Sequence, residues 1–404
     1  MSLQKIRSFD DLNVVAKQSR HVLTLFSGGL DSSYVLKELA DRGCRVTALA
    51  VDVGEGAAVK DLQDITRQFG ATLRVVDARE EFALDAVLPA IRAQARYLGM
   101  YPISSSLSRP ILARTAVHLA HELGCDAIIH TANQSQNSLR RLNGAIEQLG
   151  FSGLYGTPYE FSAMTRAEKI DALQAVGMSK FQARGISGDA NLWCREFESG
   201  ALDNPEAFWV PESLFDWTAP SEAIEVAADF SVTFERGVPV AIDGQCLPLL
   251  NLISRLNLQA GAFGVGRYSG LEHLEQGEKV LEVREAPAAT VLMDAYRHLE
   301  TATLAFELIR EKMTQEQLWV REAIEGRWFG AVREAADSFI ASTARYVTGT
   351  VGYRLRPGAA DVCSIKADKP LYLTDRDSWE QKVARERARM QLTLPATRRE
   401  AVCS

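Results

Sequence analysis

The residues most suited to chemistry form a short loop rich in glycine and serine. An apolar run over 21–26 leads into Ser27-Gly28-Gly29-Leu30-Asp31-Ser32-Ser33, and helical spacing follows over 32–42. The two glycines permit a sharp turn in which backbone N–H groups approach an anion without hindrance from a Cβ atom. The helix that follows directs its positive N-terminal end to the same place, and the serines add hydroxyl donors. This arrangement predicts a phosphate-binding loop.

Asp31 is the member of the loop that would repel a phosphate. It is predicted either to cap the helix or to hold Mg²⁺ against pyrophosphate. The loop has no lysine after its second glycine, so it differs from G-x-x-x-x-G-K-[ST], and it also differs from G-x-G-x-x-G. A plain strand–turn–helix corner without a ligand is the alternative interpretation.

The elements that must position this loop alternate along the first 160 residues or so. Strands are predicted at 21–26, 45–53, 72–76 and 127–130, and helices at 32–42, 61–69, 82–96 and 110–123. Strands separated by helices predict a parallel sheet with helices on both faces.

The pattern changes after about residue 150 and predicts an α+β second half. An antiparallel pair is expected over 223–241 around the turn Arg236-Gly237. The remaining predictions are helices at 165–176, 247–258, 288–314 and 378–390, strands at 339–353 and 371–374, and a loop-rich stretch at 185–220.

The bulk composition limits the classes of function. The chain has 404 residues, enough for two domains, and 47% of them are hydrophobic against 24% charged, as in ordinary globular proteins. A net charge of −7 argues against nucleic-acid binding over an extended surface, because such binding usually needs a basic surface. The six cysteines are scattered, and no stretch has the apolar length of a signal or membrane-spanning segment. We therefore expect a cytoplasmic protein with no nucleic-acid or membrane partner.

The loop resembles the S-G-G-x-D-S signature of the ATP pyrophosphatase (PP-loop) family, and the wider pattern resembles argininosuccinate synthase. The similarity runs with gaps from about His21 to the end of the chain. It is carried by residues 26–36, 101–114 (Y-P-I-S-S-S-L-S-R-P-I-L-A-R), 130–143, 187–193 (S-G-D-A-N-L-W) and 264–267 (G-V-G-R), together with Glu272 and Glu285-Ala286-Pro287.

The resemblance implies a two-step ligation. In that family ATP adenylates the ureido oxygen of citrulline with release of pyrophosphate, and the amine of aspartate then displaces AMP. It implies ATP and Mg²⁺, small-molecule substrates, and a homotetramer with a C-terminal helix that reaches across subunits. It also implies an α/β PP-loop domain over 1–163, an α+β synthetase and multimerisation domain over 164–370, and a C-terminal helix and tail over 371–404.

Family positions can be carried over residue by residue. The resemblance assigns ATP binding to Phe26, Ser27, Gly28, Gly29, Leu30, Asp31, Ser32, Ser33, Val51 and His130. It assigns catalysis to Asp31, Ser33 and Arg109, with Asp31 also the Mg²⁺ ligand. It assigns substrate binding to Tyr101, Ser105, Ser106, Asn133, Asn137, Ser138, Arg141, Ser187, Glu196, Glu198, Glu272 and Arg284.

Several of these positions depart from the family pattern. The family's H-G-A-T-G-K-G-N-D-Q-V-R-F-E becomes H-T-A-N-Q-S-Q-N-S-L-R-R-L-N over 130–143. The threonine and aspartate that hold the aspartate substrate become Asn133 and Ser138. A serine that faces citrulline becomes Glu196, and a tyrosine near it becomes Arg284. Because each swap changes charge or donor pattern in a small pocket, we expect altered substrates.

The leading hypothesis is therefore an AMP-forming C–N ligase of the argininosuccinate synthase type with altered substrate choice, suited to specialised metabolism. The alternatives are an ordinary argininosuccinate synthase that tolerates the swaps, a non-catalytic ATP-binding sensor or scaffold, and a tRNA-modifying pyrophosphatase that shares the loop. The acidic balance and the second-half match weigh against the last.

Overall fold

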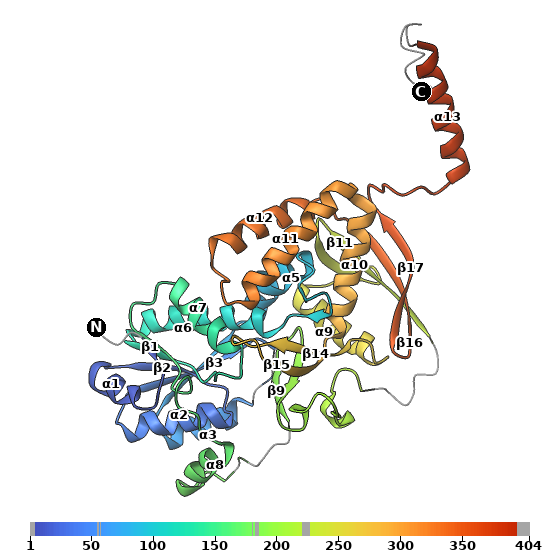
Figure 1. Ribbon diagram of the computed structural model, residues 1–404. Helices are drawn as coiled ribbons and strands as arrows, with labels where there is room; N and C mark the ends of the chain where they lie inside the picture. Colours follow the sequence, from blue (N-terminus) through green and yellow to red (C-terminus); the bar gives the residue numbers. More distant parts are fainter. Residues whose placement is uncertain are drawn as a thin grey trace.

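The computed structural model describes residues 5–54, 56, 58–179, 181, 186–219 and 227–393. Figure 1 shows a unit built around a sheet from the first part of the chain, packed beside a second unit of helices and strands. A final helix stands apart from both. The arrangement confirms the predicted fold class, a parallel α/β unit followed by an α+β unit and a C-terminal helix.

The first unit is organised on a six-stranded sheet in which every adjacent pair is parallel. Its order is β1-β8-β7-β2-β3-β4. The strands are β1 (Lys5–Ile6), β2 (Val22–Leu25), β3 (Val46–Asp52), β4 (Thr72–Asp77), β7 (Ala127–Ile129) and β8 (Leu154–Gly156). The four predicted strands are confirmed, whereas β1 and β8 are too short to give a pattern in the sequence.

Helices cover both faces of this sheet. Alternate residues of one strand enter different cores, since Val22 packs with one group of helices and Leu23 with the other. This two-sided burial explains why β2 and β3 read as continuous apolar runs. The helices of this unit are α1 (Asp11–Gln18), α2 (Leu30–Asp41), α3 (Val59–Gln68), α6 (Ser105–Leu123), α7 (Ser138–Gln148) and α8 (Arg166–Ala175).

A segment of the first half leaves the parallel sheet and enters the core of the second unit. Buried residues from Ala78 to Ile111 share one hydrophobic core with Trp193, Leu256 and Tyr296. The segment contains α4 (Arg79–Phe82), a π-helical turn η1 (Ala83–Val87), α5 (Leu88–Arg92), β5 (Arg96–Tyr97) and β6 (Tyr101–Pro102). The helix predicted at 82–96 is therefore confirmed over 82–92, where it includes the π-helical turn, but it begins earlier, at Arg79, and ends earlier, at Arg92.

Two antiparallel sheets lie in the second unit. The four-stranded sheet has the order β14-β15-β10-β9, from β9 (Ser187–Ala190), β10 (Arg195–Glu198), β14 (Arg267–His273) and β15 (Lys279–Glu285). The five-stranded sheet has the order β13-β12-β11-β16-β17, from β11 (Ala228–Glu235), β12 (Val238–Ile242), β13 (Gln245–Cys246), β16 (Gly349–Arg356) and β17 (Ala359–Ala367). Strand β11 pairs with β12 across Arg236-Gly237, which confirms the predicted hairpin, although residues 223–226 of that stretch lie outside the described residues.

The helices of the second unit correct three predictions. They are α9 (Leu249–Gly261), α10 (Pro287–Thr303), α11 (Phe306–Ile324) and α12 (Ala331–Ala344), with 3₁₀ turns η2 (Gly200–Leu202) and η3 (Glu212–Leu214). The helix predicted at 288–314 is two helices, since Leu304 and Ala305 adopt extended backbone angles. The strand predicted at 339–353 is helix α12 over 339–344, where its apolar residues pack against α11, and is confirmed as strand β16 over 349–353. No strand forms over 371–374.

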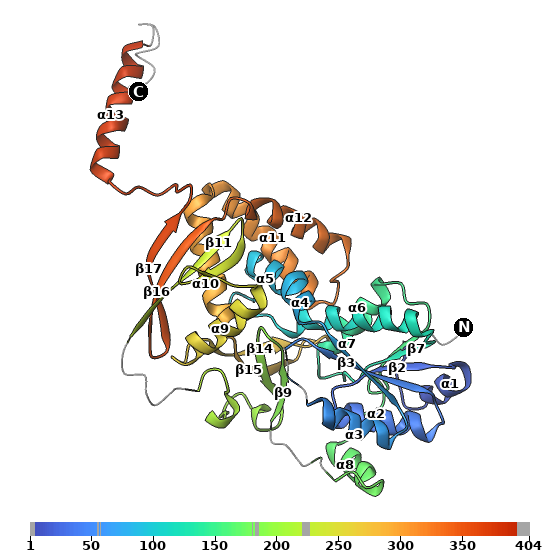
Figure 2. The ribbon, with the colours of Figure 1, turned by 180° about the vertical axis from the view of Figure 1, so that it is seen from behind.

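Helix α13 (Arg376–Thr393) confirms the predicted C-terminal helix, and residues 394–404 lie outside the described part. Figure 2 shows the helix projecting away from the rest of the chain from behind. Within the ranges given above, no helix is both long and apolar enough to cross a membrane. The domain boundaries at residues 163 and 370 stay predictions. Helix α8 follows the first of these boundaries in the chain but packs on α2 of the first unit.

Candidate active site

The glycine-serine loop closes the carboxyl end of β2. Gly28 has φ +73°, and a Cβ atom there would lie 2.5 Å from Leu62 Cδ2, so only glycine fits this turn. The Ser27 hydroxyl accepts a hydrogen bond from the Gly29 N–H at 3.3 Å, and Gly29 caps α2. The loop is held by its own backbone and hydroxyl groups and leaves the N-terminus of α2 facing outward.

Ser32 and Ser33 differ in how their hydroxyls are used. Ser32 Oγ donates to the Gly29 carbonyl at 3.1 Å. Ser33 Oγ is buried and has no hydrogen-bond partner within the described part of the chain. A phosphate oxygen seated in the loop would give this hydroxyl the acceptor it lacks. Phe26 and Leu30, also assigned to ATP binding, are buried on either side of the turn.

Asp31 forms an ion pair that sequence reasoning missed. Lys169 on α8 places its Nζ 2.6 Å from Asp31 Oδ1. The ammonium group also lies 5.0 Å from the centre of the Tyr159 ring, and the Tyr159 hydroxyl donates to the Asp31 carbonyl at 3.2 Å. The lysine therefore neutralises the one carboxylate of the loop. Helical spacing placed Lys169 on a helix, but no sequence signal placed that helix beside the loop.

The sheet brings two further predicted ATP-binding residues to the same edge. Strands β7, β2 and β3 are neighbours and parallel, so their carboxyl ends lie together. Val51 lies near the end of β3, and His130 directly follows β7. The loop, Val51 and His130 thus lie along one edge of the sheet, as a nucleotide site in an open α/β sheet requires.

His130 is a buried, neutral histidine. Its Nε2 lies 2.9 Å from Asn143 Oδ1, and its Nδ1 accepts from the Ala132 N–H at 3.3 Å. Burial lowers the pKa of His130 to about 4, despite the hydrogen bond that the ring donates to Asn143 Oδ1, and the positive charge of Arg109 lowers it further. The ring orients the chain after β7 and ties it to α7.

The same helix, α7, carries a second group of predicted residues. Arg141 is buried and pairs with Glu272 on β14 at 2.6 Å, while it also donates to Ser105 Oγ at 2.8 Å. Asn137, at the start of α7, donates to Glu272 Oε1 at 3.1 Å. Helix α7 therefore links the edge of the parallel sheet to the four-stranded sheet.

Arg284 occupies the centre of this second group. Its Nη2 lies 2.9 Å from Glu272 Oε2 and 3.0 Å from Glu196 Oε1, and it also contacts Glu282. Its guanidinium carbon stacks 4.2 Å from the centre of the Tyr101 ring. Glu282 was not among the predicted residues, because β15 was not recognised as a strand that faces the site.

The charged side chains in this group shift one another's pKa values. Burial by itself would raise the pKa of Glu272, but Arg141 and Arg284 hold it at about 2. Burial raises the pKa of Glu196, and Arg284 only partly offsets the effect. Burial likewise raises the pKa of Glu198, although Gln136 donates a hydrogen bond to its carboxylate at 2.8 Å. Carboxylates with raised pKa values lie here beside one with a lowered value.

Arg109 joins the two sides of the site. Its Nε donates to Ser138 Oγ at 3.0 Å, and its Nη2 pairs with Asp189 on β9. Asp189 lies opposite Glu196 in the sheet register. Arg109, the predicted catalytic arginine, therefore contacts residues 187–193, one of the segments that carry the family resemblance.

Not every predicted substrate residue joins the cluster. Asn133 accepts hydrogen bonds from Ser135, so its side chain stabilises its own loop. Ser187 lies at the edge strand opposite Glu198, and Ser106 is buried in the first turn of α6. The roles of these three residues stay predictions.

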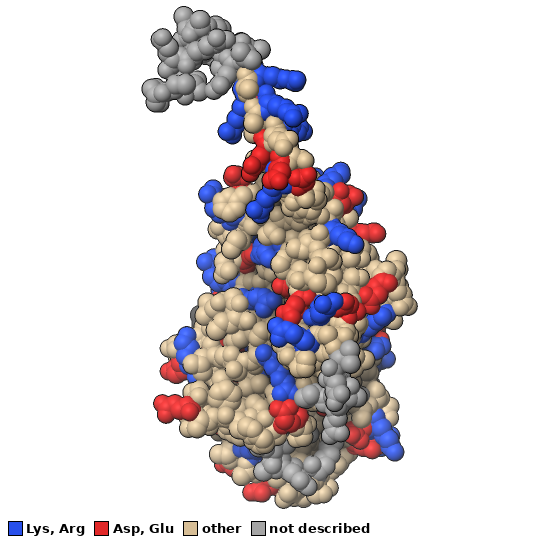
Figure 3. Space-filling view, turned by 90° about the vertical axis from the view of Figure 1, so that its right-hand side faces the viewer, with Lys and Arg blue, Asp and Glu red and all other residues tan. Residues whose placement is uncertain are grey.

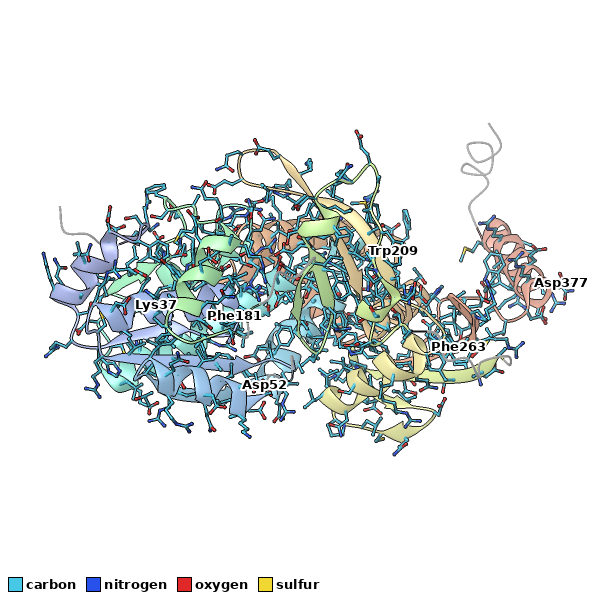
Figure 4. All side chains as sticks on the ribbon, turned by 90° about the horizontal axis from the view of Figure 1, so that it is seen from below. Lys37, Asp52, Phe181, Trp209, Phe263 and Asp377 are labelled. Atoms are coloured by element: carbon cyan, nitrogen blue, oxygen red, sulfur yellow. The ribbon has the colours of Figure 1, made fainter. Side chains whose placement is uncertain are left out.

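On the face drawn in Figure 3, the described residues show no comparable gathering of charge. In Figure 3 basic and acidic side chains are interspersed over the body of the molecule. Figure 4 places Lys37 and Asp52 in the first unit, Trp209 and Phe263 in the second, and Asp377 on the isolated helix. The described residues contain no group of three or more His, Cys, Asp or Glu side chains able to hold a metal ion.

Comparisons with known proteins agree on one family. Residues 21–178 match the model of the arginosuccinate synthase N-terminal HUP domain, and residues 186–392 match the arginosuccinate synthase C-terminal domain. The argininosuccinate synthase of Rubrobacter xylanophilus is 36% identical over 365 residues, which is 89% of each chain. That of Symbiobacterium thermophilum is 37% identical over 364 residues, covering 88% of this chain and 90% of its own.

A solved structure is similar over part of the chain. The NH3-dependent NAD synthetase from Campylobacter jejuni subsp. jejuni NCTC 11168, in complex with the nitrate ion, is 17% identical and covers 42% of this chain and 70% of its own, with a TM-score of 0.29. A likeness of this size carries no argument about the site.

The buried His130 makes a prediction about pH and stability. Its pKa of about 4 in the folded chain lies below the 6.5 of a free histidine, so the unfolded chain binds the extra proton between these values. Stability from this group is complete above pH 6.5 and is lost as the pH falls toward 4, by up to about 3 kcal/mol. Urea unfolding followed by tryptophan fluorescence from pH 8 to pH 4 measures the loss. In His130→Gln the free energy of unfolding should depend less on pH between pH 6.5 and 4. The same pH dependence in the variant as in the unmodified chain would contradict the lowered pKa of His130.

Proposed function

Because the chain belongs to the argininosuccinate synthase family, and is accordingly an ATP-dependent ligase that forms C–N bonds, we propose that its acceptor and its amine differ from citrulline and aspartate. The observation that carries the proposal is the buried group around Arg284. At the two positions where the family has a serine and a tyrosine near citrulline, this chain has Glu196 and Arg284, and they contact each other at 3.0 Å.

The loop at the end of β2 supports the phosphate half of the reaction. The outward N-terminus of α2 and the Ser33 hydroxyl are suited to the charge that builds on departing pyrophosphate. Lys169 removes the repulsion that Asp31 would otherwise exert on that charge. We propose that residues 26–33, with Val51 and His130, hold ATP, and that Asp31 and Ser33 act directly on its phosphates.

Mg²⁺ fits this loop as an ion carried by the phosphates. Magnesium is usually bound by one or two carboxylates together with substrate phosphates and water. Asp31 is the carboxylate at the loop, and its side chain is one-third exposed. Asp31 would hold the ion, which would stabilise charge on the leaving pyrophosphate.

The amine half of the site is also altered. Where the family has an aspartate, Ser138 accepts a hydrogen bond from Arg109, and no carboxylate at that position is available for an incoming ammonium group. Arg109 is held by Asp189 as well. We propose that Arg109 and Ser138 orient the amine substrate, and that Asn133 does not face it directly.

The second candidate is argininosuccinate synthase itself. It is favoured by the names of the relatives, which share 36–37% identity over nearly nine-tenths of this chain. Under this reading, Tyr101, Ser105, Asn137, Arg141 and Glu272 hold citrulline, and Arg284 moves aside on binding. The buried pairing of Arg284 with three glutamates makes that movement costly, since it leaves buried charges unpaired.

We also propose a cytoplasmic homotetramer. Helix α13 lies away from the body and is exposed, and the segment that leads to it exposes Leu371 and Leu373. An arm of this kind is suited to packing on another copy of the chain, and gel filtration with light scattering measures the assembly.

A direct assay separates the two candidate functions. With citrulline and aspartate, the chain should release pyrophosphate at a kcat/KM at least 100-fold below that of the Rubrobacter xylanophilus enzyme assayed in parallel, because a mismatched polar pocket rejects a substrate by this order. The variant Glu196→Ser/Arg284→Tyr/Ser138→Asp should recover part of the loss. Equal kcat/KM values for the unmodified chain and the reference enzyme would refute the altered-substrate proposal.

Lys169 makes a separate prediction for the nucleotide. Lys169→Met should raise the Kd for ATP about 10-fold, since it leaves Asp31 uncompensated beside the phosphates. Lys37→Met is the matched control, because Lys37 pairs with Asp41 at 2.7 Å near the other end of α2. Isothermal titration with ATP measures both variants. The same Kd in both would show that the Lys169 ion pair has no part in binding.

A further inference from the structure

We propose that the acceptor carries a protonated amine or a guanidinium group and no carboxylate at the end that enters the Arg284 cluster. The inference rests on the proposed function, because it names the substrate class for the same altered site. It follows from the charges that the described residues place on one face of the four-stranded sheet.

Acidic side chains outnumber basic ones in this cluster. We define the cluster as the buried or nearly buried charged residues that surround Arg284, namely Glu196, Glu198, Glu272, Glu282, Arg141 and Arg284 itself. Four carboxylates face two guanidinium groups. The neighbouring charges do not change this balance, since Arg109 pairs with Asp189 and Arg140 pairs with Glu325.

The sheet register forces two of the carboxylates together. On the antiparallel strands β10 and β15, Glu196 lies opposite Arg284 and Glu198 lies opposite Glu282. Directly opposed like charges destabilise a sheet, and burial increases the effect. A cation between them would remove the repulsion.

Both guanidinium groups of the cluster already pair with glutamates, although Arg284 Nε has no hydrogen-bond partner among the residues that the structure describes. Arg141 is held by Glu272, Ser105 and the Ile324 carbonyl. Arg284 is held by three glutamates and the Pro102 carbonyl. A zwitterionic amino-acid tail such as that of citrulline would bring a carboxylate next to Glu196, where the one cation in contact, Arg284, is already shared among three glutamates.

Unpartnered buried atoms point independently to a polar ligand. The Tyr101 hydroxyl and Glu196 Oε1 have no hydrogen-bond partner among the residues that the structure describes, although Tyr101 is 1% exposed and Glu196 is 6% exposed. Glu196 Oε1 lies 3.0 Å from Arg284 Nη2 but not in hydrogen-bonding geometry. An ammonium group has three donors, and it could satisfy both oxygens.

The electrostatics of the cluster agree with this reading. Burial raises the pKa of Glu282 well above its usual range, and Glu272, Glu196 and Glu198 raise it further against the effect of Arg284. Glu282, Glu196 and Glu198 therefore bind protons more readily than in water, whereas Glu272 does not. A bound cation would take the place of those protons, since it favours the ionised forms.

Four ureas that differ only in their end groups test the inference. Citrulline has an amine and a carboxylate, (4-aminobutyl)urea has the amine alone, 5-ureidopentanoic acid has the carboxylate alone, and butylurea has neither. Exchange of labelled pyrophosphate into ATP reports acceptor adenylation and needs no amine substrate. We expect kcat/KM for exchange to be at least 10-fold higher with (4-aminobutyl)urea than with each of the other three.

The outcomes separate the two proposals. If butylurea or 5-ureidopentanoic acid is equal or better, the inference is wrong while the altered-acceptor proposal stands. If citrulline is best and matches the reference enzyme, both are wrong. If none supports exchange, the inference is overturned, and citrulline with aspartate in the pyrophosphate-release assay decides the proposed function.

A charge-removing variant adds a second measurement. Glu196→Gln keeps the shape of the side chain, and it should reduce the preference for (4-aminobutyl)urea over butylurea at least 5-fold. Glu212→Gln is the matched control, because Glu212 pairs at 2.7 Å with Arg267, which lies on the opposite face of β14 from Glu272. If Glu196→Gln keeps the same ratio of kcat/KM for (4-aminobutyl)urea over butylurea, the inference is overturned. If this variant does not fold, the same ratio in the unmodified chain still tests the inference.

Discussion

The buried carboxylate of Glu272 is the interaction on which the site depends. It receives Arg141 and Asn137 from α7, which packs on the parallel sheet, and Arg284 from β15 in the second unit. Charges removed from water at this depth are stabilised only when each has partners, and loss of one partner from a buried pair costs about 3–5 kcal/mol. The position of α7 relative to the four-stranded sheet is thereby fixed, together with the distance between the phosphate loop and the acceptor end.

A second constraint keeps the two units from separating. The segment from Ala78 to Ile111 starts at the end of β4, packs into the core of the second unit, and returns to the parallel sheet as α6. It carries Tyr101 and Ser105 at the point of return. Burial of its apolar side chains stabilises the contact over a wide area, with about 25 cal/mol gained per Å² of apolar surface. Tyr101 and Ser105, which are proposed to hold the acceptor, therefore lie on this packed junction, and a hinge between the units would have to expose its core.

The sequence predicted the parts of the molecule that local pattern controls. The phosphate loop, the strands β2 and β3, and the hairpin at Gly237 each carry their own signal, because turn geometry and two-sided burial restrict the residue types. The four-stranded sheet was missed, since strands with Glu196, Glu198, Glu282 and Arg284 on one face do not show an apolar alternation. Lys169 was missed for a different reason. Its helix was recognised, but the contact with Asp31 spans 138 positions in the chain and depends on how α8 packs on α2.

The physical separation of the two chemistries explains how a family member could change substrates and keep its reaction. The groups proposed to face the phosphates are backbone N–H groups, glycines and hydroxyls at a sheet edge, and their geometry is set by the parallel sheet. The groups proposed to face the acceptor are charged side chains on strands of another sheet, where one residue can be exchanged without moving the backbone. Exchange of a serine for Glu196 adds a buried negative charge, and exchange of a tyrosine for Arg284 adds the positive charge that pairs with it. Glu196 without Arg284 would leave a buried charge unpaired, which is costly, whereas Arg284 without Glu196 would still pair with Glu272 and Glu282. The charge of Glu196 therefore depends on Arg284, and both residues lie on the four-stranded sheet rather than on the glycine-serine loop at the end of β2.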